Sequence, residues 1–387
     1  MIYPISRISG SIYRRIIKPL LFLEAPDDAH EQMIRFGAIS QKFRPLRGFV
    51  RGCWDYENRE VLSQNLAGLN YKNPLGLSAG LDKNFSIMNM ISAIGFGQAE
   101  GGSITFRECL GNPKPWFFRL PKTKSIVVHA GLPNVGAEEI SRRVSLYDKR
   151  DFRDMLLNVS IAKSNIRETA TDVKAGVDEY VAAAKIITKL AQVSVITLNI
   201  SCPNAFGGEI FTAPKPLEHL LAAIDKLKLK QPVFIKMPGN ESDDEFRELL
   251  KVISKHHIAG VTIANLHKSR IAVKKEDELT DEIEGNLSGA PCFDRGNQLI
   301  ALAFREFGDK LVISGVGGVF SAEDAYVKIR AGASLVQMVT GLMFEGPQIV
   351  GQINRGLGKL LRRDGFANIS QAVGVDAKKY EQQKQAN

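Results

Sequence analysis

From residue 73 onwards, short apolar segments rich in β-branched residues alternate with longer segments of helical periodicity. This feature constrains the fold most, because it is typical of a parallel sheet covered by helices. Eight parallel strands joined by crossover helices close into a barrel. We therefore predict an α/β fold, a (β/α)8 TIM barrel, with strands over residues 74–77, 96–105, 155–161, 193–200, 233–237, 260–264, 311–314 and 334–339.

Polar and glycine residues gather where each predicted strand ends. In chain order the sequences there are AGLDKN, GGSIT, AKSN, NISCPN, KMPGN, NLHKS, GVGG and TGLMFEGP. Gly, Asn, Asp and Ser also dominate ordinary turns. In a barrel, however, the carboxyl ends of all strands meet at one mouth, where the chemistry takes place. Eight such ends together therefore predict a single functional site.

We expect three parts in the 387 residues: an N-terminal amphipathic helical segment (1–55), the barrel (56–370) and a polar tail (371–387). No stretch approaches the ~18–20 consecutive apolar residues of a spanning helix, and the start has no signal-peptide pattern. The four cysteines are widely scattered, so we expect neither disulfides nor a metal site. These observations indicate a cytoplasm-like compartment.

The formal charge of +9 is uneven, since residues 1–51 hold nine basic and four acidic residues. A basic patch is most often a solvated face, but it also suits nucleic acid or anionic lipid. Apolar residues at helical spacing favour lipid and predict two amphipathic helices, the second capped by Asp27 or Asp28. No aromatic pattern typical of nucleic-acid binding is present. The apolar positions are Ile12, Ile16, Leu20, Leu21, Phe22 and Leu23 in the first helix and Met33, Ile34, Phe36 and Ile39 in the second.

Glycine-rich sequences follow the last two predicted strands, GVGG at 315–318 and TGLMFEGP at 340–347. Two tight turns would also explain them, but glycines at these two strand ends form the usual phosphate site of a barrel. FMN, with one phosphate and a flat apolar ring, suits such a site. Lys236 and Lys83 would place positive charge at the mouth, where it stabilises an anionic reduced flavin or a substrate carboxylate.

Cys202, in the sequence NISCPN, is the candidate general base. A thiol has a pKa of about 8.5, which a neighbouring cation lowers, so it can accept a proton near neutral pH. Most lone cysteines are simply small buried hydrophobic residues. This one stands between Asn199 and Asn204, whose carboxamides suit a planar amide such as a pyrimidine.

Six segments resemble the dihydroorotate dehydrogenases: NPLGLSAGLDKN (73–84), GNPKPWFFRLP (111–121), NISCPN (199–204), LSGAP (287–291), GVGG (315–318) and AGASLVQMVTG (331–341). The similarity covers nearly the whole chain. The N-terminal helices and GNPKPWFFRLP resemble the quinone-linked class, which is peripheral to a membrane. That class occupies the cytoplasmic side of the inner membrane, or the mitochondrial inner membrane in a eukaryote.

The resemblance implies that Cys202 removes a proton from C5 of dihydroorotate while a hydride passes from C6 to FMN, which then reduces a quinone in pyrimidine biosynthesis. It implies that His30 and Arg119 line the quinone path. Substrate contacts would come from Lys83, Asn199, Asn204 and Asn265, with Asn134 as a further donor. FMN would be held by Ala79, Gly80, Lys83, Ser103, Ser160, Asn199, Lys236, Gly289, Gly317, Gly318, Thr340 and Gly341.

Three positions depart from the family pattern. Cys202 stands where the quinone-linked class has serine; a cysteine at this position is typical of the soluble class. Val128 replaces an asparagine, and Leu266 replaces a threonine. Val128 and Leu266 each remove a polar partner, and a substrate whose buried polar groups stay unpaired binds much more weakly. The substrate could therefore be another dihydropyrimidine or a cyclic amide. His129 or Asn134 could supply a missing donor. A catalytically inactive, membrane-associated flavin-binding protein is a further alternative.

Overall fold

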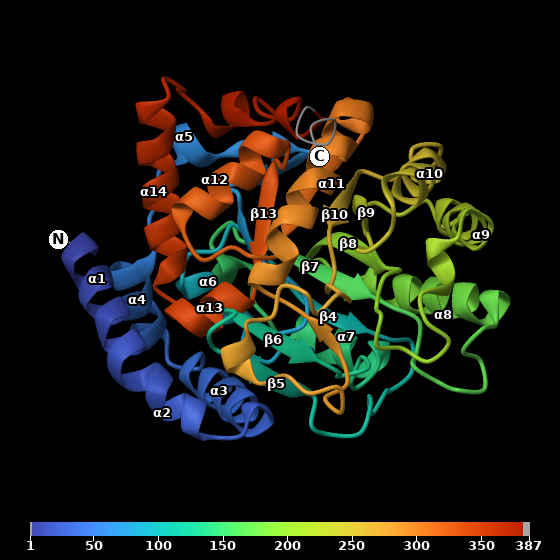
Figure 1. Ribbon diagram of the computed structural model, residues 1–387, viewed down its shortest axis with the longest axis horizontal. Coiled ribbons are helices and arrows are strands. Elements are labelled where there is room, and N and C mark those ends of the chain that lie inside the picture. Colours follow the sequence, from blue (N-terminus) through green and yellow to red (C-terminus); the bar gives the residue numbers. More distant parts are fainter. Residues whose placement is uncertain (1, 382–387) are drawn as a thin grey trace.

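The computed structural model describes residues 2–381 and contains a closed barrel of eight parallel strands (Figure 1). Around the ring the order is β3, β4, β7, β8, β9, β10, β12, β13. The predicted strands are confirmed, with ends that differ by at most two residues. The strands are β3 (Leu75–Leu77), β4 (Gln98–Ile104), β7 (Leu156–Ile161), β8 (Val193–Asn199), β9 (Val233–Lys236), β10 (Gly260–Ile263), β12 (Val312–Val316) and β13 (Leu335–Met338).

Helices surround the barrel because their apolar faces pack on the outward side chains of the strands. Their starts follow local capping rules: Ser242 and Glu245 form a capping box at α10, and Asp172 accepts from the Ala175 amide at α8. The helices are α6 (Met88–Ala93), α7 (Ala137–Ser145), α8 (Val173–Ile187), α9 (Pro214–Asp225), α10 (Asp243–Ile253), α11 (Phe293–Phe307), α12 (Ala322–Ala331), α13 (Thr340–Glu345) and α14 (Ile349–Arg363). Short 3-10 turns span Lys149–Phe152, Ile210–Thr212, Lys275–Asp277, Ala290–Cys292 and Ile369–Ala372.

Two small sheets lie outside the barrel, and neither was expected from the sequence. A hairpin of β1 (Gln64–Leu66) and β2 (Leu69–Tyr71) precedes the first barrel strand. A three-stranded antiparallel sheet joins β5 (Phe117–Leu120), β6 (Ser125–Val128) and β11 (Asn286–Leu287). Because β5 and β6 follow barrel strand β4 and β11 follows β10, this sheet belongs to loops at the carboxyl ends of the strands.

The N-terminal helices lie along one side of the barrel (Figure 1). They are α1 (Ile2–Ile12), a π-helical turn (Tyr13–Ile17), α2 (Lys18–Leu23), α3 (Pro26–Ser40), α4 (Arg44–Trp54) and α5 (Arg59–Leu62). The prediction that Asp27 or Asp28 caps the second helix is wrong. Ala25 occupies the N-cap, and Asp27 instead accepts hydrogen bonds from the amides of Trp116 and Phe117 at β5. This carboxylate attaches α3 to the three-stranded sheet of β5, β6 and β11, here called the mouth sheet.

Helices α1–α4 and the segments joining them expose many large apolar side chains, a pattern that marks an interaction surface. None of the helices in residues 2–381 is both long and apolar enough to cross a bilayer. The exposed side chains are Ile5, Ile8, Ile12, Ile16, Ile17, Leu20, Leu23, Met33, Phe36, Ile39, Phe43, Leu46 and Phe49.

The start of the predicted C-terminal tail packs against α12. Asp376 forms ion pairs with Arg330 and Lys379, and Ala377 is buried. The tail beyond residue 381 lies outside the described residues, and the division at residues 55 and 370 stays a prediction.

Candidate active site

A pocket lies at the carboxyl ends of the barrel strands. It brings together seven of the residues predicted to hold the cofactor and one predicted substrate contact, Asn265. Loops after β3, β10, β12 and β13 and the end of β9 contribute to its wall. The lining residues are Ser78, Ala79, Lys236, Ala264, Asn265, Leu266, Ser288, Gly289, Cys292, Val316, Gly317, Gly318, Val319, Met338, Val339, Thr340 and Gly341.

The glycine-rich part of this wall admits no side chain. Gly317 and Gly318 have positive φ values of +97° and +72°, a region that favours glycine. A Cβ atom on Gly318 would lie 2.6 Å from Cβ of Phe293, and one on Gly341 would lie 2.0 Å from the Val319 carbonyl oxygen. Gly317, Gly318 and Gly341, here called the glycine cradle, therefore keep this part of the pocket wall free of side chains, as close approach of a phosphate group to the backbone requires.

Lys236 lies at the end of β9 with its ammonium group buried in the pocket wall. Its Nζ lies 3.3 Å from Ser78 Oγ. Burial lowers the pKa of Lys236, and the negative charges of Glu100 and the Cys202 thiolate partly offset that shift. Glu100 is itself buried inside the barrel, where it accepts a hydrogen bond from Thr197. A positive charge is therefore held in the wall of the same pocket as the glycine cradle, where it favours an anionic ligand.

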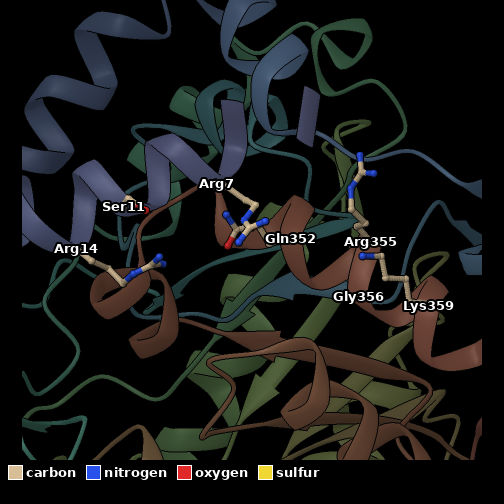
Figure 2. Close-up of a pocket in the computed structure, with 7 residues that line it drawn as sticks. All are labelled: Arg7, Ser11, Arg14, Gln352, Arg355, Gly356 and Lys359. Carbon is tan, nitrogen blue, oxygen red and sulfur yellow. The ribbon is translucent and has the colours of Figure 1, made fainter. Parts of the chain in front are cut away.

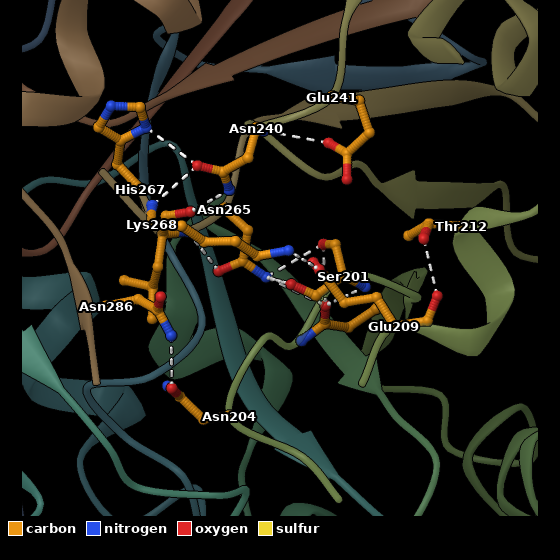
Figure 3. Close-up of polar contacts among 12 residues, drawn as sticks. Ser201, Asn204, Glu209, Thr212, Asn240, Glu241, Asn265, His267, Lys268 and Asn286 are labelled. Atoms are coloured by element: carbon orange, nitrogen blue, oxygen red, sulfur yellow. Dashed lines mark hydrogen bonds and ion pairs between the residues drawn. The ribbon is translucent and has the colours of Figure 1, made fainter. Parts of the chain in front are cut away.

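A chain of polar side chains crosses the ends of β4, β7, β8 and β10. Ser103 and Ser160 share a hydrogen bond of 2.7 Å, and Asn199 Nδ2 donates to Ser103 Oγ at 2.8 Å. Asn265 Nδ2 donates to the Ser201 carbonyl and to its Oγ at 2.5 and 3.0 Å, as Figure 3 shows. Ser103, Ser160 and Asn199 do not line the pocket. They support its wall through Asn265, whose Nδ2 donates to Asn199 Oδ1 at 3.4 Å.

Cys202 follows Ser201 directly and is partly buried. Burial raises the pKa of the Cys202 thiol to about 11, a shift only partly opposed by the Asn204 backbone and Lys236. The expectation that a neighbouring cation would lower this pKa is therefore wrong, because desolvation of the thiolate outweighs the attraction of Lys236. The two groups are nonetheless close enough for each to shift the other's pKa.

Lys83 carries a second buried ammonium group. Its Nζ has no hydrogen-bond partner among the described residues and lies 4.9 Å from the centre of the Phe117 ring. Burial lowers the pKa of Lys83 to about 8. Neighbouring His30 has its pKa lowered to about 4 by burial and by Lys83, and its Nε2 lies 2.9 Å from the Leu81 carbonyl oxygen. A buried cation without an acceptor is costly unless an anion joins it.

Asn286, which the sequence reasoning missed, contacts the predicted site residue Asn204. It pairs across the mouth sheet with Val128, and its Nδ2 donates to Asn204 Oδ1 at 2.7 Å (Figure 3). Asn204 Nδ2 donates in turn to the Val128 carbonyl at 2.9 Å. One N–H and one lone pair of the Asn204 carboxamide thus stay available. The strand pairing of β11 with β6 would have been needed to find Asn286.

Two further predicted residues, Asn134 and Arg119, do not line the pocket. Asn134 accepts from the amides of Thr105 and Gly136, and its Nδ2 donates to Thr105 Oγ1 and the Leu132 carbonyl. Its hydrogen-bonding capacity is therefore used inside the loop, which argues against the predicted substrate contact. Arg119 donates to the Glu24 carbonyl at 2.6 Å and lies 4.7 Å from the centre of the Phe22 ring, so it binds the end of α2 to β5.

The fold and this pocket define a (β/α)8-barrel enzyme with a glycine-lined pocket at its mouth. Residues 61–361 match the family model described as dihydroorotate dehydrogenase, and the chain belongs to that family. The membership carries with it a flavin cofactor.

Curated relatives match the chain over nearly its whole length. A protein of Trichodesmium erythraeum named dihydroorotate dehydrogenase (quinone) is 32% identical over 94% of this chain and 99% of its own length. One of the same name from Deinococcus deserti is 34% identical over 95% of this chain and 100% of its own. The crystal structure titled DHODH in complex with ferulenol, from Eimeria tenella, has a TM-score of 0.79 and 25% identity over 91% of this chain and 95% of that one.

Substituting alanine for Gly318 tests the glycine cradle. The new Cβ would clash with Phe293 and strain a backbone of positive φ, so we expect Gly318→Ala to be purified with less than about a tenth of the flavin. Gly365→Ala is the control, because its φ is +80° but no atom lies within 4 Å of the added Cβ. The ratio of flavin to protein absorbance measures the flavin content of both variants relative to wild type. Equal flavin content in Gly318→Ala and wild type would contradict flavin binding at the glycine cradle.

Proposed function

We propose that this protein oxidises dihydroorotate to orotate at the barrel mouth, with FMN as cofactor and a quinone as acceptor, as a step of pyrimidine biosynthesis. The names of its full-length relatives support the reaction. The observation that carries the proposal is one pocket in which the glycine cradle, buried Lys236 and Asn265 meet, with Ser201 and Cys202 beside it.

FMN fits the residues of this pocket. Backbone amides near Gly317, Gly318 and Gly341 would hold its single phosphate, and Ala79, Gly289 and Thr340 would line the same wall. Lys236 would lie against the ring system, where a buried cation stabilises added negative charge. When bound, FMN supplies a two-electron acceptor for the hydride that leaves C6 of the substrate.

The substrate would be held by complementary charge and by amide pairing. Dihydroorotate carries a carboxylate, and the unpaired Nζ of Lys83 is a buried cation that such a group would satisfy. Asn204 has one free donor and one free acceptor, which suits the N–H and C=O of a pyrimidine ring. Asn199 and Asn265 would complete the contacts from β8 and β10.

Cys202 would take the proton from C5 while the hydride leaves C6. A thiol with a pKa near 11 is mostly protonated at neutral pH, so only a small fraction of the enzyme holds the reactive thiolate. A base that is rarely ionised but strongly basic still works, because proton affinity rises with pKa.

The helical segment would bring the enzyme to its quinone. The exposed apolar side chains of α1–α4 and their connecting segments, flanked by basic residues, suit peripheral attachment to a membrane surface. His30 and Arg119 lie where α3 and α2 contact the mouth sheet and would line the quinone path. The compartment would be the cytoplasmic side of the inner membrane, or the mitochondrial inner membrane if the source is eukaryotic.

A second substrate class is favoured by one specific observation. Leu266 lines the pocket where the family pattern has a hydroxyl-bearing threonine. An apolar side chain there removes one hydrogen-bond partner, which would favour another, less polar dihydropyrimidine or cyclic amide over dihydroorotate.

Anaerobic addition of dihydroorotate to the purified yellow protein tests the reaction. Hydride transfer reduces the flavin, so we expect its visible absorbance to bleach within the time of manual mixing. The neutral analogue dihydrouracil, which lacks the carboxylate that Lys83 would bind, serves as the comparison. Bleaching by dihydrouracil alone would replace the first substrate by the second class, and no bound flavin would refute the cofactor.

The rate of flavin reduction is expected to depend on pH through Cys202. Because a raised thiol pKa leaves the reactive form scarce below it, the rate should rise by about tenfold per unit between about pH 7 and pH 9. Cys202→Ser should be slower at neutral pH, since a hydroxyl ionises less readily. Cys53→Ser, the same change in a buried cysteine of α4, should match wild type. Stopped-flow absorbance gives both profiles; a plateau below pH 8 would rule out this base.

Asn286 is expected to position Asn204 for the substrate. Asn286→Ala removes a hydrogen bond to the Asn204 carboxamide, so KM for dihydroorotate should rise by about five- to tenfold with flavin content unchanged. Val128→Asn added to this variant should restore much of the loss, because the new carboxamide stands on the opposite strand position. Steady-state kinetics measure both; an unchanged KM in Asn286→Ala would assign Asn286 a purely structural role.

A further inference from the structure

Residues 200–212, here called the Cys202 loop, follow β8 and end in the 3-10 turn Ile210–Thr212. Side chains from other loops hold this segment at the barrel mouth. Asn112 Nδ2 donates to the Asn204 carbonyl oxygen at 3.0 Å and fixes the first half of the loop. The second half is fixed through Glu209.

Glu209 forms an ion pair with Lys268, on the segment that follows β10 (Figure 3). The Glu209 side chain is only 8% exposed, whereas that of Lys268 is 47% exposed. The backbone of Lys268 is held in turn, because its amide donates to Asn240 Oδ1 at 2.8 Å. Asn240 Nδ2 donates to the Leu266 carbonyl oxygen at 2.9 Å. The ion pair therefore joins the Cys202 loop to the segments that follow β9 and β10.

This pair differs from ion pairs at the outer surface. Arg14, in the pocket between α1 and α14, lies 3.5 Å from Glu345 (Figure 2), and that pocket shares no lining residue with the active-site pocket. Lys251 and Glu248 pair at 2.7 Å on α10, where both side chains are more than half exposed. Exposed pairs contribute little. A nearly buried carboxylate such as that of Glu209 depends on its partner, because an uncompensated charge is costly where water is excluded.

The charge of Glu209 acts on the Cys202 thiol. Burial is the main cause of the raised pKa of Cys202, and the negative charge of Glu209 adds to that rise. Lys268 balances this charge from the other side of the ion pair, so its removal would let the full charge of Glu209 oppose the thiolate. The other titratable groups that act on the thiol or on the ion pair are Lys236, Cys109, Tyr180 and Glu241.

We propose that Lys268 is a positioning residue for the proton transfer at Cys202. Through its ion pair it holds the Glu209 end of the Cys202 loop in place and balances the negative charge that Glu209 brings to the thiol. This inference rests on the proposed role of Cys202 as the base.

Alkylation of Cys202 by iodoacetamide tests the inference in the flavoprotein without substrate. The thiolate is the reacting form, and mass spectrometry of the peptide that contains Cys202 follows the rate. We expect Lys268→Met to lower the rate at pH 8 by about threefold or more, because an uncompensated carboxylate disfavours a second negative charge nearby. Glu209→Gln should raise the rate, and Lys268→Met should have a smaller effect when it is added to Glu209→Gln. Lys268→Arg, which can keep the ion pair, should match wild type.

The sign of the two changes separates charge balance from a purely structural contact. Lys268→Met and Glu209→Gln remove the same ion pair, so a structural role alone predicts the same direction of change in both, whereas charge balance predicts opposite directions. Changes in the same direction, or no change in either variant, would overturn the inference. Lys251→Met is the matched control, because it removes an ion pair with Glu248 and makes the same change in net charge. It should alter the alkylation rate by less than about twofold.

Flavin reduction by dihydroorotate separates this inference from the function on which it rests. With Cys202 as the base, stopped-flow rates at pH 8 should fall in the order Glu209→Gln, wild type, Lys268→Met. Opposite changes in alkylation without any flavin reduction in wild type would support the charge balance at the thiol and refute the proposed reaction. Flavin reduction in wild type together with alkylation changes of the same direction would keep the reaction and overturn the role of Lys268.

Discussion

Parallel closure of the barrel is the constraint on which the site depends. The ring closes where β13 pairs with β3, which sets Val336 beside Leu75 although more than half the chain separates them. Once all eight strands run in one direction, every loop after a strand opens at the same end. Residues at the ends of β3, β9, β10, β12 and β13 therefore line one pocket, although they range from Ser78 to Gly341 in the sequence. The outer helices and the buried apolar side chains serve mainly to hold that closure.

Two buried ammonium groups indicate that the barrel mouth favours an anionic ligand. Lys236 and Lys83 are both desolvated, which lowers the pKa of each, and Lys83 Nζ has no hydrogen-bond partner among the described residues. Burial of unsatisfied charge destabilises a folded protein unless a ligand returns the lost interaction. The same desolvation raises the pKa of Cys202. Desolvation at the barrel mouth thus favours anionic ligands beside Lys236 and Lys83 and leaves the Cys202 thiol mostly protonated at neutral pH.

The parts of this structure that follow from local pattern could be predicted from the sequence. The strands were found because apolar runs keep their periodicity, and the glycine cradle because Gly317, Gly318 and Gly341 follow the last two strands. What depends on tertiary contact could not. Strand β11 has two residues and exists only through pairing with β6, so Asn286 had no signal. The role of Asp27 likewise depends on amides 89 and 90 residues away.

The mouth sheet connects the helical segment to the reaction site. Strand β5 carries Arg119, which holds the end of α2, and begins at Phe117, whose amide binds Asp27 and whose ring lies over Lys83. Its neighbours β6 and β11 place Val128 and Asn286 against Asn204. Because hydrogen bonds join the strands of this sheet, a shift of α2 or α3 at a membrane would displace the Asn204 carboxamide, which we propose binds the substrate. On the proposed function, we therefore expect a substitution in the helical segment to change KM without contacting the pocket, and one at Gly317, Gly318 or Gly341 to change cofactor content first.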